Sequence, residues 1–100
     1  MDMELNSRQL PQSLEAEQAV LGSILIDSRC LTEVIGILHA EDFYMEQNRR
    51  IYQAIYTMFN FSQTIDPVTV LDKMKELGFY RDDSRNYILQ LMEITPTAAN

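Results

Sequence analysis

One short stretch of the sequence combines the side-chain types that most often bind a metal ion. It contains a histidine and three acidic residues, His39, Glu41, Asp42 and Glu46. A typical zinc site draws several ligands from cysteine and histidine, and this chain has one of each. Acidic residues are also common near helix starts, where they face the positive end of the helix dipole. The pattern therefore favours helix capping over a metal site.

Nucleotide and nucleophile chemistry are equally poorly supported. A phosphate-binding loop needs glycines followed by a lysine and a hydroxyl residue, and no Gly-Lys-Ser/Thr sequence occurs here. The two lysines, Lys73 and Lys75, fall within an expected helix. Cys30 lies beside an apolar stripe, where most cysteines act as small hydrophobic residues. We expect no catalytic, cofactor-binding or metal-binding residue in this chain.

The charge balance argues against tight binding of nucleic acid. Fifteen acidic residues outnumber eight basic ones, for a formal net charge of −7. Phosphate binding needs clustered lysine and arginine, and only Arg49 and Arg50 are adjacent. A single cysteine allows no internal disulfide and favours a cytosolic setting, and the acidic start Met1–Asn6 is unlike a signal peptide. Apolar runs such as Ile24–Ile26 are far too short to span a membrane.

Two polar residues interrupt otherwise apolar helical faces. Glu17 falls in the apolar arc of its helix, and Asn48 points to the apolar side of another. Glu17 can be interpreted as a polar anchor for a partner or for a second copy of the domain. It can also be interpreted as a carboxylate that accepts backbone N–H groups or pairs with Arg49. The cost of an unpaired buried charge favours this second interpretation, and Asn48 is interpreted in the same way, as a hydrogen-bonding core residue.

Apolar residues in loops or near helix ends are the better candidates for contact with a partner. Four of them are expected to be the more exposed: Met45, Phe61, Phe79 and Tyr80. We expect Phe79 and Tyr80 to contact a protein partner, with Arg81 at the edge of that contact.

The elements that must position these residues are helices joined by short turns. Three glycines and three prolines punctuate the chain, and no segment shows sustained strand-like alternation. Asp66 as N-cap, Pro67 at the first helical position and Gly78 after the end bracket a helix of about eleven residues. Ser13 is the expected cap of a helix over Leu14–Ile26. Further helices are expected over about 28–38, 46–61 and 85–95, with a short helical turn within 39–44.

These patterns predict an all-α fold, a compact bundle of about five to six short amphipathic helices. One hundred residues suffice for a single small core. Leu21 and Ile55 are expected at its centre. Residues nearer the helix ends that are also expected to face inward are Leu14, Phe59, Val68, Leu77 and Ile94.

Four stretches resemble the N-terminal domain of bacterial replicative DNA helicases of the DnaB type. They are Pro11–Asp27 (PQSLEAEQAVLGSILID), Glu41–Tyr44 (EDFY), Ile65–Val70 (IDPVTV) and Pro96–Asn100 (PTAAN), in the family's order and spacing. Members of this family are hexameric rings that unwind duplex DNA by hydrolysing ATP. The resemblance implies a helical collar domain that mediates subunit pairing and binds the C-terminal domain of primase, with a helicase loader left open as a third partner. ATP and magnesium would belong to the family's motor domain.

The resemblance also divides the chain. Residues 1–12 are expected to be a flexible arm, 13–96 the helical domain, and 97–100 the start of a linker that leads to the motor in the family. We therefore expect an excised domain of a cytoplasmic bacterial protein. Asn48 departs from the histidine often found in the family, and Asp83-Ser84 departs from a frequent Gly-Gly pair, so this loop should take a different turn.

Two alternatives remain. A free-standing helical adaptor or regulator could share this bundle without any motor domain. A helix-turn-helix DNA-binding protein is less well supported, because the chain is acidic and lacks a basic recognition helix.

Overall fold

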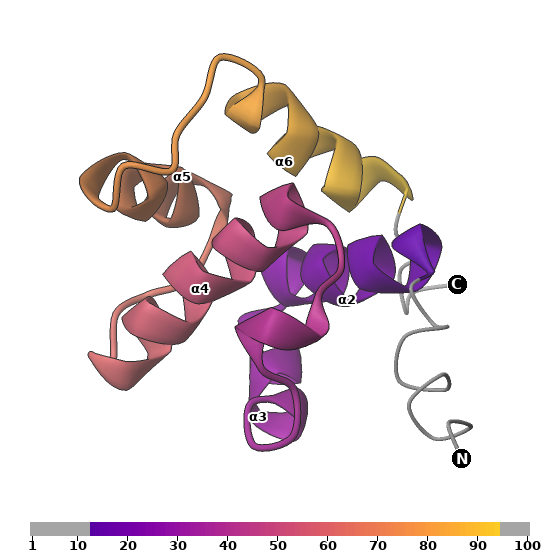
Figure 1. Cartoon of the computed structure of the whole chain (residues 1–100). Helices are drawn as coiled ribbons and strands as arrows, with labels where there is room; N and C mark the ends of the chain where they lie inside the picture. The colour runs from indigo at the N-terminus through magenta and orange to yellow at the C-terminus, as the bar shows by residue number, and fades with distance from the viewer. Residues whose placement is uncertain (1–12, 95–100) are drawn as a thin grey trace.

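The computed structural model describes residues 13–94, which form five α-helices and two short 3-10 helices (Figure 1). The α-helices are α2 (Leu14–Ile26), α3 (Leu31–Val34), α4 (Glu46–Asn60), α5 (Pro67–Glu76) and α6 (Ser84–Ile94). The 3-10 helices are η1 (Ser28–Cys30) and η2 (Ala40–Asp42). Because no strand occurs in this range, the all-α prediction is confirmed. The expected arm at 1–12 and linker start at 97–100 lie outside the described residues.

The helix boundaries follow from local hydrogen bonds that the sequence signals. The Ser13 hydroxyl accepts the Ala16 N–H at 3.1 Å and so caps α2. At α5, the Asp66 carboxylate accepts the Thr69 N–H, and the Thr69 hydroxyl accepts the Asp66 N–H, both at 2.9 Å. Gly78 follows the end of α5 with a φ of 78°, which glycine adopts without steric cost. The bounds of α2 and α5 are therefore set by their own caps.

The segment from 28 to 38 differs from the single helix expected there. Asp27 caps η1 by accepting the Arg29 N–H at 3.1 Å, and α3 then lasts for only four residues. The chain returns to the bundle at Leu38, whose carbonyl accepts the Tyr52 hydroxyl of α4 at 2.8 Å. Leu31 is fully buried, so even this short helix contributes to the core.

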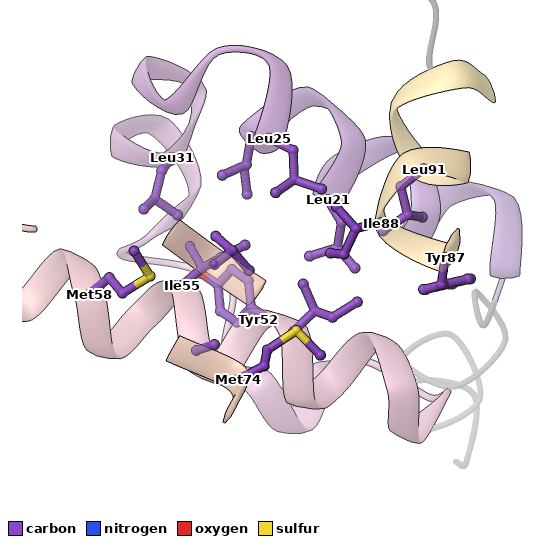
Figure 2. Packing of buried hydrophobic residues seen from close by; sticks show 14 of the residues in the cluster. Leu21, Leu25, Leu31, Tyr52, Ile55, Met58, Met74, Tyr87, Ile88 and Leu91 are labelled. Carbon is purple, nitrogen blue, oxygen red and sulfur yellow. The ribbon is translucent and has the colours of Figure 1, made fainter. Parts of the chain in front are cut away.

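The core lies where α2, α4, α5 and α6 meet, and its side chains point toward one another from all four helices (Figure 2). Contact is most extensive between α2 and α6, followed by α4 and α5. Leu21, Ile55 and Leu91 are completely shielded from solvent. Burying such a side chain stabilises a fold by roughly 1.5–3 kcal/mol. The predicted core centre at Leu21 and Ile55 is confirmed.

The predicted core was wrong at the helix ends. Five residues expected to face inward are exposed instead: Leu14, Phe59, Val68, Leu77 and Ile94. Each lies in the first or last turn of its helix or at its cap. Helical periodicity predicts the direction of a side chain, but it does not say where the facing helix ends.

Candidate interaction site

Glu17 binds the backbone of the turn that leads into another helix, α4. It lies in the first turn of α2 with 9% of its surface exposed. Its carboxylate accepts the backbone N–H groups of Tyr44 at 2.6 Å and Met45 at 3.4 Å, just before α4. Met45 is the N-cap residue of α4 but supplies no side-chain cap. A carboxylate is favoured at a helix N-terminus by the free N–H groups and the helix dipole.

Arg49, the other partner considered for Glu17, bonds elsewhere. Its side chain donates to the carbonyl oxygens of Phe43 at 3.4 Å and Tyr44 at 3.1 Å. Arg49 thus closes the same turn from its carbonyl side, while Glu17 closes it from its N–H side.

Asn48 extends the Glu17 contacts into the core. It is fully buried, and its Nδ2 donates to Glu17 at 2.9 Å. Its Oδ1 accepts the hydroxyl of Tyr87 from α6, and Gln18 Nε2 donates to that hydroxyl at 3.3 Å. We call Glu17, Asn48 and Tyr87 the buried polar cluster. It connects α2, α4 and α6.

The buried polar cluster has the chemistry of a structural network. Among the described residues, no buried side-chain nitrogen or oxygen lacks a hydrogen-bond partner, as is usual in folded cores. Burial raises the pKa of the Tyr87 phenol, and hydrogen bonds with Gln18 and Asn48 oppose this rise. The phenol therefore remains protonated near neutral pH, where it can donate to Asn48.

Phe79, Tyr80 and Arg81 lie between α5 and α6, and we call them the contact loop. Tyr80 is 36% exposed, and the Lys75 ammonium lies 4.9 Å from the centre of its ring. Such cation–π contacts contribute about 0.5–1 kcal/mol at exposed sites. Arg81 is exposed, and its backbone N–H donates to the Ser84 hydroxyl at 2.8 Å where α6 begins.

Phe79 is less exposed than predicted. It is partly buried against the core, and the Arg50 guanidinium lies 5.1 Å from its ring centre. Met45 is also partly buried, beside the turn that Glu17 caps, whereas Phe61 is exposed as expected. A position near a helix end therefore did not ensure exposure, and at Phe79 the Arg50 side chain and the core cover part of the ring.

Two surface pockets share the Phe79 side chain in their walls. The first has a volume of about 180 Å³ and is lined by Glu46, Gln47, Arg50, Met74, Phe79, Arg81, Asp83 and Ser84. The second has a volume of about 320 Å³ and is lined by Ala40, Gln53, Tyr56, Thr57, Leu77 and Phe79. The first is smaller than most small-molecule sites, which occupy about 300–1,000 Å³.

Among the described residues, His39 and Asp42, first considered as metal ligands, make other contacts. Within residues 13–94, no three side chains of His, Cys, Asp or Glu are arranged to hold a metal ion. The Asp42 carboxylate accepts the backbone N–H of His39 at 2.9 Å and lies 3.7 Å from its Nδ1. Cys30 is partly buried against the core.

Within residues 13–94, every helix is too short or too polar to cross a membrane.

The sequence and the fold both match a known family of helicase N-terminal domains. The family described as "DnaB-like helicase N terminal domain" matches residues 9–100. The chain belongs to this family, and the resemblance noted in its sequence is confirmed.

The chain is similar to a solved structure and to individual replicative helicases. The crystal structure of the N-terminal domain of DnaB helicase from Mycobacterium tuberculosis matches with a TM-score of 0.82 and 34% identity, covering 90% of this chain and 66% of that one. The replicative DNA helicase DnaB of Geobacillus stearothermophilus is 36% identical over 104 residues. The replicative DNA helicase DnaC of Bacillus subtilis (strain 168) is 34% identical over 97 residues. The matches cover 97% and 96% of this chain but 22% and 21% of the relatives, so the chain spans about a fifth of their length.

Sequence reasoning missed two residues that organise these sites. Tyr87 lies in the helix expected over about 85–95, and a tyrosine on an apolar helical face signals a hydroxyl that needs a buried partner. Ser84 was expected in the loop, but it begins α6, is 2% exposed and accepts the Arg81 N–H. Its signal was the preference of serine for helix starts.

Proposed function

We propose that this chain is the N-terminal interaction and assembly domain of an ATP-dependent hexameric replicative DNA helicase. The match of residues 9–100 to the helicase N-terminal domain family carries this proposal. The relatives named as replicative DNA helicases support it. ATP and magnesium would serve the motor of such a protein, and we assign no residue of this segment to them. The parent protein would act in the bacterial cytoplasm.

The proposed partners are other copies of the domain and the C-terminal domain of primase. The contact loop is the proposed primase surface. Aromatic residues and arginine are enriched in protein interfaces and among their energetically dominant residues, and the loop presents Phe79, Tyr80 and Arg81 together. The pockets on Phe79 offer space for partner side chains. A helicase loader is a further candidate partner, for which we assign no surface.

Titration with the cognate primase C-terminal domain tests this surface. We expect a Phe79→Ala, Tyr80→Ala double variant to bind at least about tenfold more weakly than the unaltered chain, because aromatic anchors dominate interface energy. Phe61→Ala is the matched control, since Phe61 is 70% exposed and lines neither Phe79 pocket. Circular dichroism would show that each variant keeps its helical fold.

The outcomes of this titration distinguish a wrongly assigned primase surface from a chain that does not bind primase on its own. Equal affinity of the double variant and the unaltered chain would remove the contact loop from the interface. Failure of the unaltered chain to bind would mean that primase needs an assembled collar or further parts of the protein.

A further inference from the structure

A third pocket lies against the turn that leads into α4. It has a volume of about 220 Å³, and its walls are Leu14, Glu17, Tyr44 and Met45. Leu14 is 47% exposed and Tyr44 is 71% exposed, so both side chains are available to a partner. None of these four residues lines either of the pockets beside Phe79.

The hydrogen bonding of Glu17 leaves this pocket suited to an apolar group. The Glu17 carboxylate already accepts from the Tyr44 and Met45 N–H groups and from Asn48. The remaining walls come from a leucine, a methionine and a tyrosine. A large apolar side chain could enter without leaving a buried polar group unpaired, which is the usual penalty for such burial.

The chain segment that supplies the pocket walls is strongly acidic. Residues 13–45 carry six carboxylates and one arginine, a formal charge of −5 with histidine neutral. That arginine, Arg29, is engaged by Asp27 through two hydrogen bonds of 2.9 and 2.8 Å. Residues 46–94 carry seven acidic and six basic residues, a formal charge of −1. The acidic character of the described chain is thus concentrated in the part that contributes Leu14, Tyr44 and Met45.

Exposed acidic residues lie next to the pocket walls in sequence. Glu15 follows Leu14, and Glu41 lies three residues before Tyr44. Arg49 also borders this turn, where its side chain donates to the carbonyls of Phe43 and Tyr44 and contributes one positive charge beside these carboxylates. A partner with lysine or arginine beside its apolar anchor would therefore meet complementary charge, which favours association and its orientation.

We propose that the pocket of Leu14, Glu17, Tyr44 and Met45 is a docking site for a basic protein segment. The segment inserts one large apolar side chain between Leu14 and Tyr44, and its basic residues face the exposed carboxylates of Glu15 and Glu41. This site is separate from the proposed primase surface, so the domain would have two binding surfaces of different chemistry.

Two synthetic helical peptides test the proposal. They share one pattern of leucines and carry either lysine or glutamate at every polar position. Binding to the 100-residue chain is followed by fluorescence anisotropy at physiological salt. The lysine peptide should bind and the glutamate peptide should not. Tyr44→Ser should weaken lysine-peptide binding at least about tenfold, as expected for a central aromatic anchor.

Ile37→Ser is the matched control. Ile37 is 75% exposed in the same acidic region, but it does not line the pocket. It should change lysine-peptide affinity less than about twofold, because surface residues outside an anchor contribute little. Amide resonances of Tyr44 and Met45 should shift when the peptide binds. If Tyr44→Ser does not fold, Leu14→Ser takes its place under the same criteria.

Four results would overturn the proposal. The first two are that the lysine peptide does not bind, or that both peptides bind equally well. The other two are that Tyr44→Ser and Ile37→Ser weaken lysine-peptide binding equally, or that the unaltered chain self-associates and Tyr44→Ser abolishes this self-association. The last result would assign the pocket to a second copy of the chain. Because neither peptide contains primase sequence, this test and the primase titration can fail independently.

Discussion

The buried polar cluster and the contact loop use similar side chains in opposite ways. Both combine aromatic rings with charge, but the Glu17–Asn48–Tyr87 cluster closes its hydrogen bonds inside the core. At the contact loop, Arg50 from α4 lies over the ring of Phe79, and Lys75 from α5 lies over the ring of Tyr80. Phe79 also lines two open pockets.

The difference separates stability from binding. Charge-assisted hydrogen bonds shielded from water are strong, and their loss leaves buried groups unpaired. Cation–π contacts at a surface are weaker and leave part of each ring available to a partner. Substitutions in the cluster should therefore change the free energy of unfolding, and those at Tyr80 and Arg81 in the loop should mainly change binding.

The largest effect is expected from Glu17→Ala. It removes the acceptor of the Tyr44 and Met45 N–H groups and of the Asn48 amide. An unsatisfied buried donor costs about 1–3 kcal/mol, and the Tyr44 and Met45 N–H groups are only partly buried, so the free energy of unfolding should fall by roughly 3–5 kcal/mol rather than by three full penalties. Glu15→Ala is the control in the same helical turn, and as an exposed residue it should change stability by less than about 0.5 kcal/mol. Urea unfolding followed by circular dichroism measures both.

A small effect at Glu17 would break the comparison. If Glu17→Ala costs less than about 1 kcal/mol, water must replace the carboxylate at the start of α4. The cluster would then not be a closed part of the core.

Parts of this fold could be predicted because they depend on local rules. Ser13 caps the helix that follows it, and Asp66 with Thr69 closes a capping box within four residues. The inward direction of Leu21 and Ile55 followed from helical period alone. Such signals lie within one turn of the residues they organise, so a single sequence contains them.

The cluster and the contact loop depend on distant neighbours. Glu17 and Asn48 are separated by 31 positions, and Asn48 and Tyr87 by 39. Periodicity shows that each faces inward, but only the packing of three helices shows that they meet. Likewise, the partial burial of Phe79 depends on Arg50 from α4. The exposure of Leu14 and Val68 depends on where the opposing helices end. The sequence of the helix that contains each residue does not predict this.

A smaller effect is expected from Tyr87→Phe. The substitution keeps the ring but removes the donor to Asn48 and the acceptor of Gln18, so it should cost about 1 kcal/mol. Tyr80→Phe is the matched control, and it should change stability by less than about 0.5 kcal/mol because its ring lies at the surface. Equal losses at the two tyrosines would show that the buried hydroxyl has no special role.

The same tyrosine sharpens the comparison at alkaline pH. An unfolded tyrosine has a pKa of about 10, and burial raises the pKa of Tyr87 above it. Its contribution to stability is therefore complete below about pH 10 and is lost as pH rises through the folded pKa. Burial also raises the pKa of Tyr52 to about 12. Stability should fall between about pH 10 and 12, and less steeply in Tyr87→Phe than in Tyr80→Phe.

The smallest effect is expected in the contact loop, from the pair of Lys75 and Tyr80. A double-mutant cycle with Lys75→Gln and Tyr80→Leu should give a coupling energy of about 0.5 kcal/mol, the value of an exposed cation–π contact. The cycle is measured by the same urea unfolding, so its result is directly comparable with the losses at Glu17 and Tyr87. A coupling above about 1.5 kcal/mol would exceed an exposed contact and would make the loop a stability element. A value near the expected one would mean that Tyr80 can be substituted without unfolding the bundle. A change in primase affinity on substitution of Tyr80 would then report on binding alone.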